Sequence, residues 1–265
     1  MHSPKFARYS SKREQTTLAN AKILGVIPAR YASVRFPAKA LVDIGGKSMI
    51  RRVYEQVKKA GRISEIVVAT DDSRIEEHVL GFGGNVVMTS PDHRSGTDRC
   101  YEAYTLSGRS FDYVINIQGD EPFIQPGQID ELASILDGEV QLGTMVKVID
   151  DVKVLFNENV PKAILNVAND VVYFSRQTIP FFRGIPSDQW LNQHKYYKHI
   201  GIYAYRTDVL AEITRLDVSP LEKAEALEQL RWIENGYKIR AVVTSYDSYG
   251  VDTPADLETV ARKFL

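Results

Sequence analysis

The sequence predicts an α/β protein with a doubly wound, mostly parallel sheet. From residue 22 onward, short apolar runs alternate with amphipathic segments, and the connections between them are short. Strands and helices that alternate in this way form parallel sheets with right-handed crossovers. Charged loops follow several of the apolar runs, at the carboxyl ends of the strands, where open α/β sheets bind their ligands. We therefore expect a Rossmann-like core whose site lies along one edge of the sheet.

Hydrophobic periodicity places the elements of the first half. We expect strands at 23–27, 65–70, 85–88, 113–118 and 141–148, with helices at 48–60, 73–82, 96–104 and 128–136. Ser48 is a suitable N-cap for the first helix, and Gly61 is a suitable residue to end it.

The pattern changes after about residue 155. We expect strands at 162–167, 171–175, 197–205 and 237–245, and helices at 207–214, 220–235 and from 254 onward. We interpret residues 155–205 as a smaller β-rich inserted subdomain that presents an acceptor pocket and a dimer surface. Residues 22–265 are then one domain with this insert, and the polar residues 1–21 are expected to be a disordered extension.

Composition excludes several classes of function. The formal charge of −1 over 265 residues gives no broad basic field for nucleic acid. The single cysteine, Cys100, excludes an intrachain disulfide and a multi-thiolate metal site, and it fits a reducing cytoplasm. We expect Cys100 to be a buried packing residue. No apolar stretch approaches the length that spans a membrane.

An apolar strand runs directly into a loop with three cations. Arg30, Arg35 and Lys39 lie within ten residues, and Pro28 and Pro37 restrict the backbone on either side. Arginine offers forked donors to phosphate oxygens, and lysine offers a mobile point charge. A single arginine here would be read as part of a solvated loop. Three cations behind a buried strand favour a site for a polyanion such as a nucleoside triphosphate.

Two aspartates are candidate ligands for a divalent metal that would accompany a triphosphate. Asp120 follows the apolar run at 113–117, and Asp252 follows the run at 237–243. Mg²⁺ takes hard oxygen ligands, often one or two carboxylates together with phosphates and water. Asp252 also precedes Thr253 and Pro254, so a helix cap is an alternative for it.

Two common phosphate-binding motifs are absent. Gly46-Lys47-Ser48 has the ending of a P-loop, but Leu41 stands where that motif requires glycine. No Gly-x-Gly-x-x-Gly follows the first strand. The pair Gly45-Gly46 is better read as a tight turn before a helix.

Eight short segments follow one another along the chain in a recognisable order. They are Ile-Pro-Ala-Arg-Tyr-Ala-Ser-Val-Arg-Phe-Pro-Ala-Lys-Ala-Leu at 27–41, Val-Ala-Thr-Asp at 68–71, Met-Thr-Ser-Pro-Asp-His-Arg-Ser-Gly-Thr-Asp-Arg at 88–99, Gln-Gly-Asp-Glu-Pro at 118–122, Tyr-Phe-Ser-Arg at 173–176, His-Ile-Gly-Ile-Tyr at 199–203, Leu-Glu-Gln-Leu-Arg at 227–231 and Gly-Val-Asp-Thr-Pro at 250–254. Taken together, these segments resemble the sugar-activating cytidylyltransferases, in particular the 3-deoxy-manno-octulosonate (Kdo) cytidylyltransferase or CMP-Kdo synthetase family. The resemblance is collinear from about residue 22 to the C-terminus.

The resemblance implies a nucleotidyltransferase core and a reaction. CTP and the acid sugar Kdo would give CMP-Kdo and pyrophosphate, with Mg²⁺ as the cofactor. Arg30, Arg35, Lys39 and Asp120 would be catalytic, with Lys39 the most rate-sensitive of the cations. Asp120 and Asp252 would bind the metal. The pathway would be lipopolysaccharide biosynthesis in a Gram-negative cytoplasm, and the enzyme would be a homodimer.

The resemblance also assigns binding residues. The nucleotide-binding set is Pro28, Ala29, Arg30, Lys39, Thr70, Asp71, Arg94, Ser95, Gly96 and Gln118. The substrate-binding set is Arg176, which would bind the Kdo carboxylate, with His199, Tyr203, Glu228 and Gln229 near its hydroxyls. For His199 a satisfied strand histidine is an equal alternative, and Tyr203 fits a core position as well. Ser95 and Gly96 can also simply start a helix.

One position departs from the pattern of the family. Ala38 stands where glycine is usual, and an alanine in a left-handed conformation would cost on the order of 1 kcal/mol.

Three other functions compete with this one. A cytidylyltransferase for 8-amino-Kdo or a sialic-type sugar would share the first loop. A nucleotide-sugar-binding glycosyltransferase would need an Asp-x-Asp motif where this chain has Gly119-Asp120-Glu121. A non-catalytic binding module would have no need to retain the cations and both aspartates.

Overall fold

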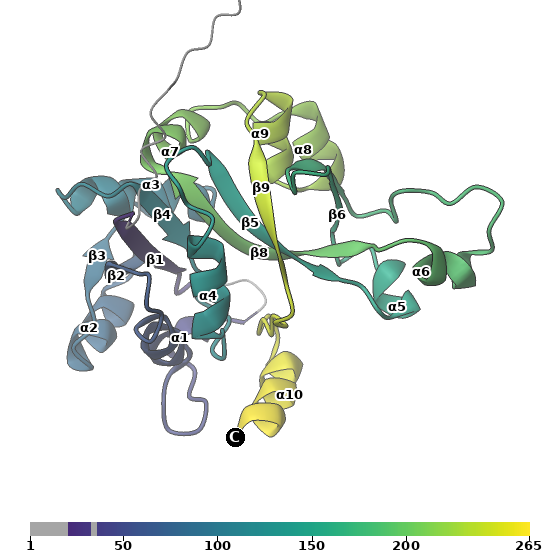
Figure 1. The fold of residues 1–265 in the computed structure, drawn as a ribbon. Coiled ribbons are helices and arrows are strands. Elements are labelled where there is room, and N and C mark those ends of the chain that lie inside the picture. The colour runs from purple at the N-terminus through teal and green to yellow at the C-terminus, as the bar shows by residue number, and fades with distance from the viewer. Residues whose placement is uncertain (1–20, 33–35) are drawn as a thin grey trace, which may run out of the picture.

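A computed structural model describes residues 21–32 and 36–265 (Figure 1). Within these ranges nine strands form a single sheet with the order β3-β2-β1-β4-β8-β5-β9, and β6 and β7 lie off this path. The strands are β1 (Ile23–Ala29), β2 (Glu65–Thr70), β3 (Val86–Met88), β4 (Tyr113–Asn116), β5 (Leu142–Val148), β6 (Lys162–Leu165), β7 (Val171–Ser175), β8 (Tyr197–Arg206) and β9 (Ile239–Thr244). Pairs β1–β2, β1–β4, β2–β3 and β5–β9 are parallel. The predicted mostly parallel α/β sheet is confirmed.

Helices cover both faces of this sheet (Figure 1). The α-helices are α1 (Met49–Val57), α2 (Ser73–Gly81), α3 (Gly96–Leu106), α4 (Pro126–Ala133), α5 (Val152–Leu155), α6 (Trp190–Gln193), α7 (Thr207–Ile213), α8 (Pro220–Glu225), α9 (Gln229–Glu234) and α10 (Pro254–Phe264), and η1 (Lys39–Leu41) and η2 (Ser187–Gln189) are 3-10 turns. The apolar sides of α1, α2 and α4 pack on one face. Those of α3, α7 and α9 pack on the other, where Cys100 is fully buried as expected.

The expected insert differs from the structure at its C-terminal end. Strand β8, which we assigned to the insert, lies between β4 and β5 and is antiparallel to both. Its residues Ile202, Ala204 and Tyr205 are buried, so the strand belongs to the core of the main sheet. The hairpin of β6 and β7 pairs with the start of β8, and α5 and α6 extend from there as a projecting arm (Figure 1).

The single helix expected over 220–235 is wrong. Ala226 has φ 50° and ψ 49°, a left-handed conformation that ends α8, and α9 begins only at Gln229. Alanine does not favour this conformation. Contacts from the neighbouring strand β7, described below, hold the chain there.

The C-terminal helix α10 supports the first loop. Val251 and Val260 are buried with Ile44 and Met49, and Phe36 packs against the same cluster. Helix α10 and the residues before it therefore pack against the segment that follows β1. No helix in the described ranges has both the length and the apolarity needed to cross a bilayer.

Candidate functional site

The loop after β1 carries the first group of predicted residues. Pro28 and Ala29 end β1 and pair with the end of β2. The chain then turns back, and Ala38 adopts φ 57° and ψ 20° just before the 3-10 turn that begins at Lys39. The left-handed conformation that would penalise alanine is therefore present at position 38. Arg35 lies outside the described residues.

Lys39 brings the two predicted metal ligands together. Its Nζ lies 2.8 Å from Asp120 Oδ2 and 3.3 Å from Asp252 Oδ1. Lys39 begins the 3-10 turn η1 after β1, Asp120 lies in the turn after β4, and Asp252 lies in the loop after β9, so the three meet beyond the carboxyl ends of these strands. Only 16% of the Lys39 side chain is exposed, so solvent screens this cluster less than it screens a surface pair. The expected meeting of Lys39 and Asp120 is observed.

The donor set fits a hard divalent cation. Two carboxylate oxygens already converge on one positive centre, the Lys39 ammonium, from different segments. Mg²⁺ is commonly held by one or two carboxylates, with substrate phosphates and water completing its shell. The described residues contain no group of three or more His, Cys, Asp or Glu side chains arranged as a metal site. Asp120 and Asp252 are thus suited to a cation that arrives with its phosphates.

Backbone contacts fix the Asp120 segment against its neighbours. Gly119 lies so close to β1 that a Cβ there would be 2.6 Å from the Pro28 carbonyl oxygen, which only glycine avoids. The Val251 N–H donates to the Asp120 carbonyl at 2.9 Å. Asp120 therefore sits between the first loop and the loop that carries Asp252.

Arg30 contacts the loop that leads into α3. Its Nη2 donates to the His93 carbonyl. This loop is held in turn by Glu102, which accepts hydrogen bonds from the Ser90 N–H at 2.7 Å and from the His93 ring. Arg30 and the predicted residue Arg94 thus belong to adjoining loops.

The N-terminus of α3 faces the ends of β1 and β4. Ser95 caps the helix by accepting from the Asp98 N–H at 3.1 Å. A Cβ on Gly96 would lie 3.2 Å from Asn116 Nδ2 and 3.9 Å from Pro28 Cγ. A helix N-terminus between strand ends is a suitable place for an anionic or polar ligand. The structure therefore brings Ser95 and Gly96 together with the end of β1, as expected for one nucleotide site.

Thr70 and Asp71 end β2 and are tied to α3. Asp71 Oδ2 lies 2.8 Å from Nη2 of Arg99, whose side chain is completely buried. Thr89 donates to the Thr70 carbonyl at 3.1 Å. Removing Asp71 would leave the buried Arg99 charge uncompensated, so its loss is expected to destabilise the fold. Asp71 is held in place at the edge of the nucleotide side.

Glu228, one of the predicted acceptor-binding residues, is hydrogen-bonded to α3. The hydroxyls of Ser95 and Thr97 donate to its carboxylate, the latter at 2.9 Å. Burial raises the pKa of Glu228 above its usual value, although these hydrogen bonds lower it. Arg94, Ser95, Glu228 and Arg231 line one cavity of about 550 Å³ between α3, α8 and α9. Residues predicted for the two substrates therefore border the same space.

Arg176 is engaged by backbone carbonyls. Its Nε donates to the Glu225 carbonyl at 2.6 Å, Nη2 to that of Ala226 at 3.3 Å, and Nη1 to that of Glu158 at 3.2 Å. The Glu225 carboxylate accepts from the Arg176 N–H at 2.8 Å and from the Ser175 hydroxyl at 2.7 Å. These bonds explain the break between α8 and α9. Binding of an acceptor carboxylate by Arg176 stays a prediction.

His199 and Tyr203 lie in an aromatic cluster on β8. The His199 ring is 4.9 Å from the Phe174 ring and 5.2 Å from that of Tyr203, and Thr144 Oγ1 lies 3.0 Å from its Nε2. Desolvation lowers the pKa of His199 to about 3, so the ring is neutral at physiological pH. The buried Tyr203 hydroxyl has no hydrogen-bond partner among the described residues. Gln229 is also buried, at the start of α9.

Gln118 joins the two halves of the site. Its Nε2 donates to the Gly201 carbonyl at 2.6 Å, so the segment that carries Asp120 is linked to the strand that carries His199 and Tyr203. The same strand is contacted on its other side by β5.

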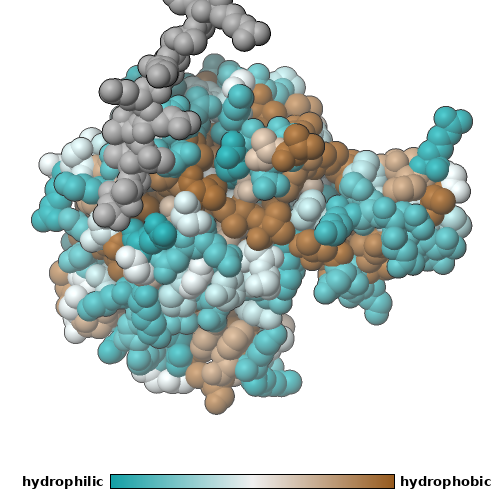
Figure 2. All heavy atoms as spheres, viewed as in Figure 1, coloured by the Kyte–Doolittle hydropathy of each residue, from teal (hydrophilic) through white to brown (hydrophobic). Residues whose placement is uncertain are grey.

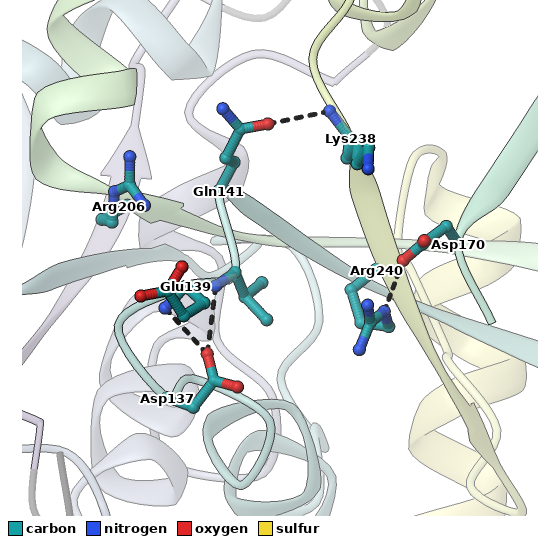
Figure 3. A pocket seen from close by; sticks show the side chains of 8 residues that line it. Asp137, Glu139, Gln141, Asp170, Arg206, Lys238 and Arg240 are labelled. Carbon is teal, nitrogen blue, oxygen red and sulfur yellow. Dashed lines mark hydrogen bonds and ion pairs between the residues drawn. The ribbon is translucent and has the colours of Figure 1, made fainter. Parts of the chain in front are cut away.

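A second hollow lies away from these residues (Figure 3). It has a volume of about 540 Å³ and is lined by Asp137, Glu139, Val140, Gln141, Asp170, Arg206, Lys238 and Arg240. Gln141 and Lys238 precede β5 and β9, so this hollow is at the opposite edge of the sheet. Arg240 pairs with Asp170 and Arg206 with Asp208. None of the predicted site residues lines it.

Several residues at the site were missed by sequence reasoning. Asn116 is a buried support that donates to the Tyr205 hydroxyl, and Glu121 is a buried carboxyl beside Asp120. Burial raises the pKa of Glu121 to about 7. The string Gln-Gly-Asp-Glu-Pro contains Glu121, but nothing in its spacing distinguishes a buried support from an exposed turn residue.

Comparison with known proteins agrees with the geometry. The cytidylyltransferase family model matches residues 24–239. A 3-deoxy-manno-octulosonate cytidylyltransferase of Bacteroides thetaiotaomicron is 57% identical over 248 residues, which cover 92% of this chain and 98% of the relative. The relative of the same name from Cytophaga hutchinsonii is 55% identical, with the same coverage.

A solved structure adds a comparison of the fold. The CMP:2-keto-3-deoxy-manno-octonic acid synthetase complexed with CTP superimposes with a TM-score of 0.85 at 41% identity, covering 92% of this chain and 98% of the other. The chain belongs to the cytidylyltransferase family, within the 3-deoxy-manno-octulosonate cytidylyltransferases, also called CMP-Kdo synthetases.

Proposed function

We propose that this enzyme transfers CMP from CTP to the anomeric hydroxyl of Kdo, giving CMP-Kdo and pyrophosphate for lipopolysaccharide biosynthesis. The observation that carries the proposal is the convergence of Lys39, Asp120 and Asp252 at one edge of the sheet. High identity to relatives named for this activity over nearly their whole length supports it.

The chain's contribution to the reaction is positioning and charge neutralisation. The acceptor hydroxyl attacks the α-phosphorus while pyrophosphate leaves, and such transfers need little covalent help from the protein. In this proposal Lys39 and Arg30 bind the triphosphate, and Lys39 offsets negative charge on the departing pyrophosphate. Magnesium bound by Asp120 and Asp252 would polarise the α-phosphate and help ionise the attacking hydroxyl.

The nucleotide is held between the ends of β1 and β4 and the N-terminus of α3. Pro28, Ser95 and Gly96 meet there, and Asp71 and Gln118 lie on either side. Pyrophosphate release measured with each of the four nucleoside triphosphates and Kdo tests this assignment. We expect rapid pyrophosphate release with CTP and Kdo, and slow release with the other three nucleoside triphosphates. Equal rates with UTP would contradict a cytidylyltransferase.

We propose that the acceptor binds in the cavity bordered by Glu228 and Ala226, where Arg176 donates to the Ala226 carbonyl, with the neutral His199 of β8 as a further ligand for its hydroxyls. A neutral imidazole and a buried tyrosine hydroxyl are suited to hydrogen bonds with sugar hydroxyls rather than to charge pairing. The test is competition between Kdo, 8-amino-Kdo and a sialic acid at equal concentration. A higher kcat/KM for 8-amino-Kdo or the sialic acid would identify that sugar as the acceptor and leave the assignment of CTP unchanged.

We also propose a homodimer that forms through the projecting arm. Phe181 is 75% exposed and Phe156 45% exposed, and both contact Trp190 in the arm. Figure 2 shows hydrophobic residues in a band that runs from the middle of this face onto the arm. Large apolar residues exposed together mark interaction surfaces. Sedimentation equilibrium should give twice the chain mass, and Phe181→Ser should weaken the association.

The single cysteine and the proposed lipopolysaccharide precursor chemistry favour a cytoplasmic location. Fractionation of cells that produce the tagged protein tests this placement, with recovery in the cytoplasmic fraction as the expected result.

A further inference from the structure

Glu121 is the one buried carboxyl next to the proposed cation site that the mechanism above does not use, among the described residues. It is 7% exposed and directly follows Asp120. Its Oε1 accepts a hydrogen bond of 2.6 Å from the Ser248 hydroxyl. Ser248 lies in the loop between β9 and α10, 127 residues away in sequence, and this loop carries Asp252.

The loop that carries Asp252 has no regular structure of its own, so contacts with neighbouring segments determine its path. Asp247 pairs with Lys147 at 2.6 Å and Lys198 at 3.4 Å, which fixes one side of the loop to β5 and β8. The other side meets the turn after β4 through the bond between Ser248 and Glu121 and through the bond from Val251 N–H to the Asp120 carbonyl.

The positions of these bonds relate Glu121 to the cation site. Asp120 and Glu121 are adjacent, and so are Val251 and Asp252. A side-chain bond at Ser248 and a backbone bond at Val251 therefore join the same two segments just before Asp252. The gap between the Asp120 and Asp252 carboxylates, now spanned by Lys39 Nζ, depends on this junction.

We propose that Glu121 is a positioning residue which, through Ser248, sets the place of Asp252 beside Asp120 for binding of the divalent cation. This inference rests on the proposed function, because it presumes that the two aspartates hold a metal with CTP. Groups that orient metal ligands typically change metal affinity about 10–100-fold when they are removed.

The test compares Glu121→Ala, Ser248→Ala and Glu121→Gln with the wild type. Binding of Mn²⁺ in the presence of CTP is followed by the electron paramagnetic resonance signal of the free ion, and the Mg²⁺ needed for half-maximal pyrophosphate release is measured separately. We expect the two alanine variants to weaken metal binding about tenfold each. The double variant should be no weaker than either single one, because both remove the same bond.

Glu121→Gln separates position from charge, because the glutamine carbonyl can still accept from Ser248. We expect its metal half-saturation to stay within about twofold of the wild type. The matched control is Glu131→Ala, which removes another 2.6 Å hydroxyl–carboxylate bond, from Thr244, at the end of β9. It should leave metal binding unchanged. Thermal unfolding of each variant shows whether it is folded. If Glu121→Ala does not fold, the test relies on Ser248→Ala.

Two results would overturn the inference. Wild-type metal affinity in Glu121→Ala or Ser248→Ala would show that the bond does not place Asp252. A loss in Glu121→Gln equal to that in Glu121→Ala would show that the charge of the carboxyl matters, not its hydrogen bond. If the wild type itself binds no Mn²⁺ with CTP, the proposed metal site fails, which is a separate outcome.

Discussion

The proposed nucleotide side and the proposed acceptor side of this site are built in different ways. On the nucleotide side, charged residues stand on loops directly after parallel strands, and they meet as partly exposed ion pairs around Lys39. On the proposed acceptor side, Arg176 is bonded to the carbonyl of Glu225 at the end of α8, and Glu228 accepts from the Thr97 hydroxyl of α3. The first side is a cluster of charged side chains that is proposed to bind phosphates. The second is a pocket whose shape depends on internal hydrogen bonds.

This difference predicts how each side fails. Loss of a charge in the partly exposed cluster around Lys39 should lower the rate and leave the fold intact. Loss of a hydrogen-bonding group on the acceptor side should disturb the pocket, and so weaken acceptor binding, even where that group does not touch the sugar. The following variants separate the two cases, from the largest expected effect to the smallest.

Lys39→Met should have the largest effect. The loss of one preorganised donor to the leaving group typically costs about 3–4 kcal/mol of transition-state stabilisation, or roughly 10²–10³-fold in kcat. Steady-state pyrophosphate release measures it. Lys59→Met is the control, because Lys59 is exposed just beyond the end of α1 and its ammonium bonds to the nearby Gln56 side chain. A Lys39→Met rate within tenfold of the wild type would remove Lys39 from the catalytic group.

Arg176→Leu should raise the KM for Kdo about tenfold or more, because three backbone carbonyls lose a charged donor. The KM for CTP should change by less than about twofold, since Arg176 lies on the acceptor side. Arg262→Leu, which removes an exposed arginine of α10, is the control. Equal changes in both KM values would mean that the two sides are not separate.

His199 should make stability depend on pH in the acid range. Its pKa is lowered to about 3 in the folded protein from an ordinary value near 6.5, so the unfolded chain binds more protons between these values. Stability is therefore full above pH 6.5 and falls as pH drops toward 3, by less than the ceiling of about 1.4 kcal/mol per pH unit. Urea unfolding at several pH values measures the slope, and His199→Gln should reduce it.

Ala38→Gly should stabilise the protein by about 1 kcal/mol, because the native φ of 57° is unfavourable for alanine. Ala255→Gly in the first turn of α10 is the opposite control and should destabilise by about 0.5–1 kcal/mol. Chemical denaturation of both variants gives the values. If Ala38→Gly were destabilised, the packing of the alanine methyl group would stabilise the protein by more than the left-handed conformation costs.

The meeting of Lys39 and Asp120 could be expected from sequence, because both lie in loops that follow neighbouring parallel strands, β1 and β4. The place of Asp252 depends in addition on contacts of its loop, such as the bond from the Val251 N–H to the Asp120 carbonyl. The acceptor side could not be foreseen in the same way. The break at Ala226 runs against local propensity and depends on bonds from Arg176, which is 50 residues away. The antiparallel place of β8 likewise depends on pairing that periodicity does not reveal.

The close approach at Gly119 limits how this site can vary. A single methyl group at that position would lie 2.6 Å from the Pro28 carbonyl oxygen, and a backbone atom cannot rotate aside as a side chain does. Saturation mutagenesis of codon 119 under selection for growth should therefore return glycine alone, while neighbouring surface codons accept many amino acids. The spacing between two main chains, more than any charge, would then set the narrowest limit on divergence of this enzyme.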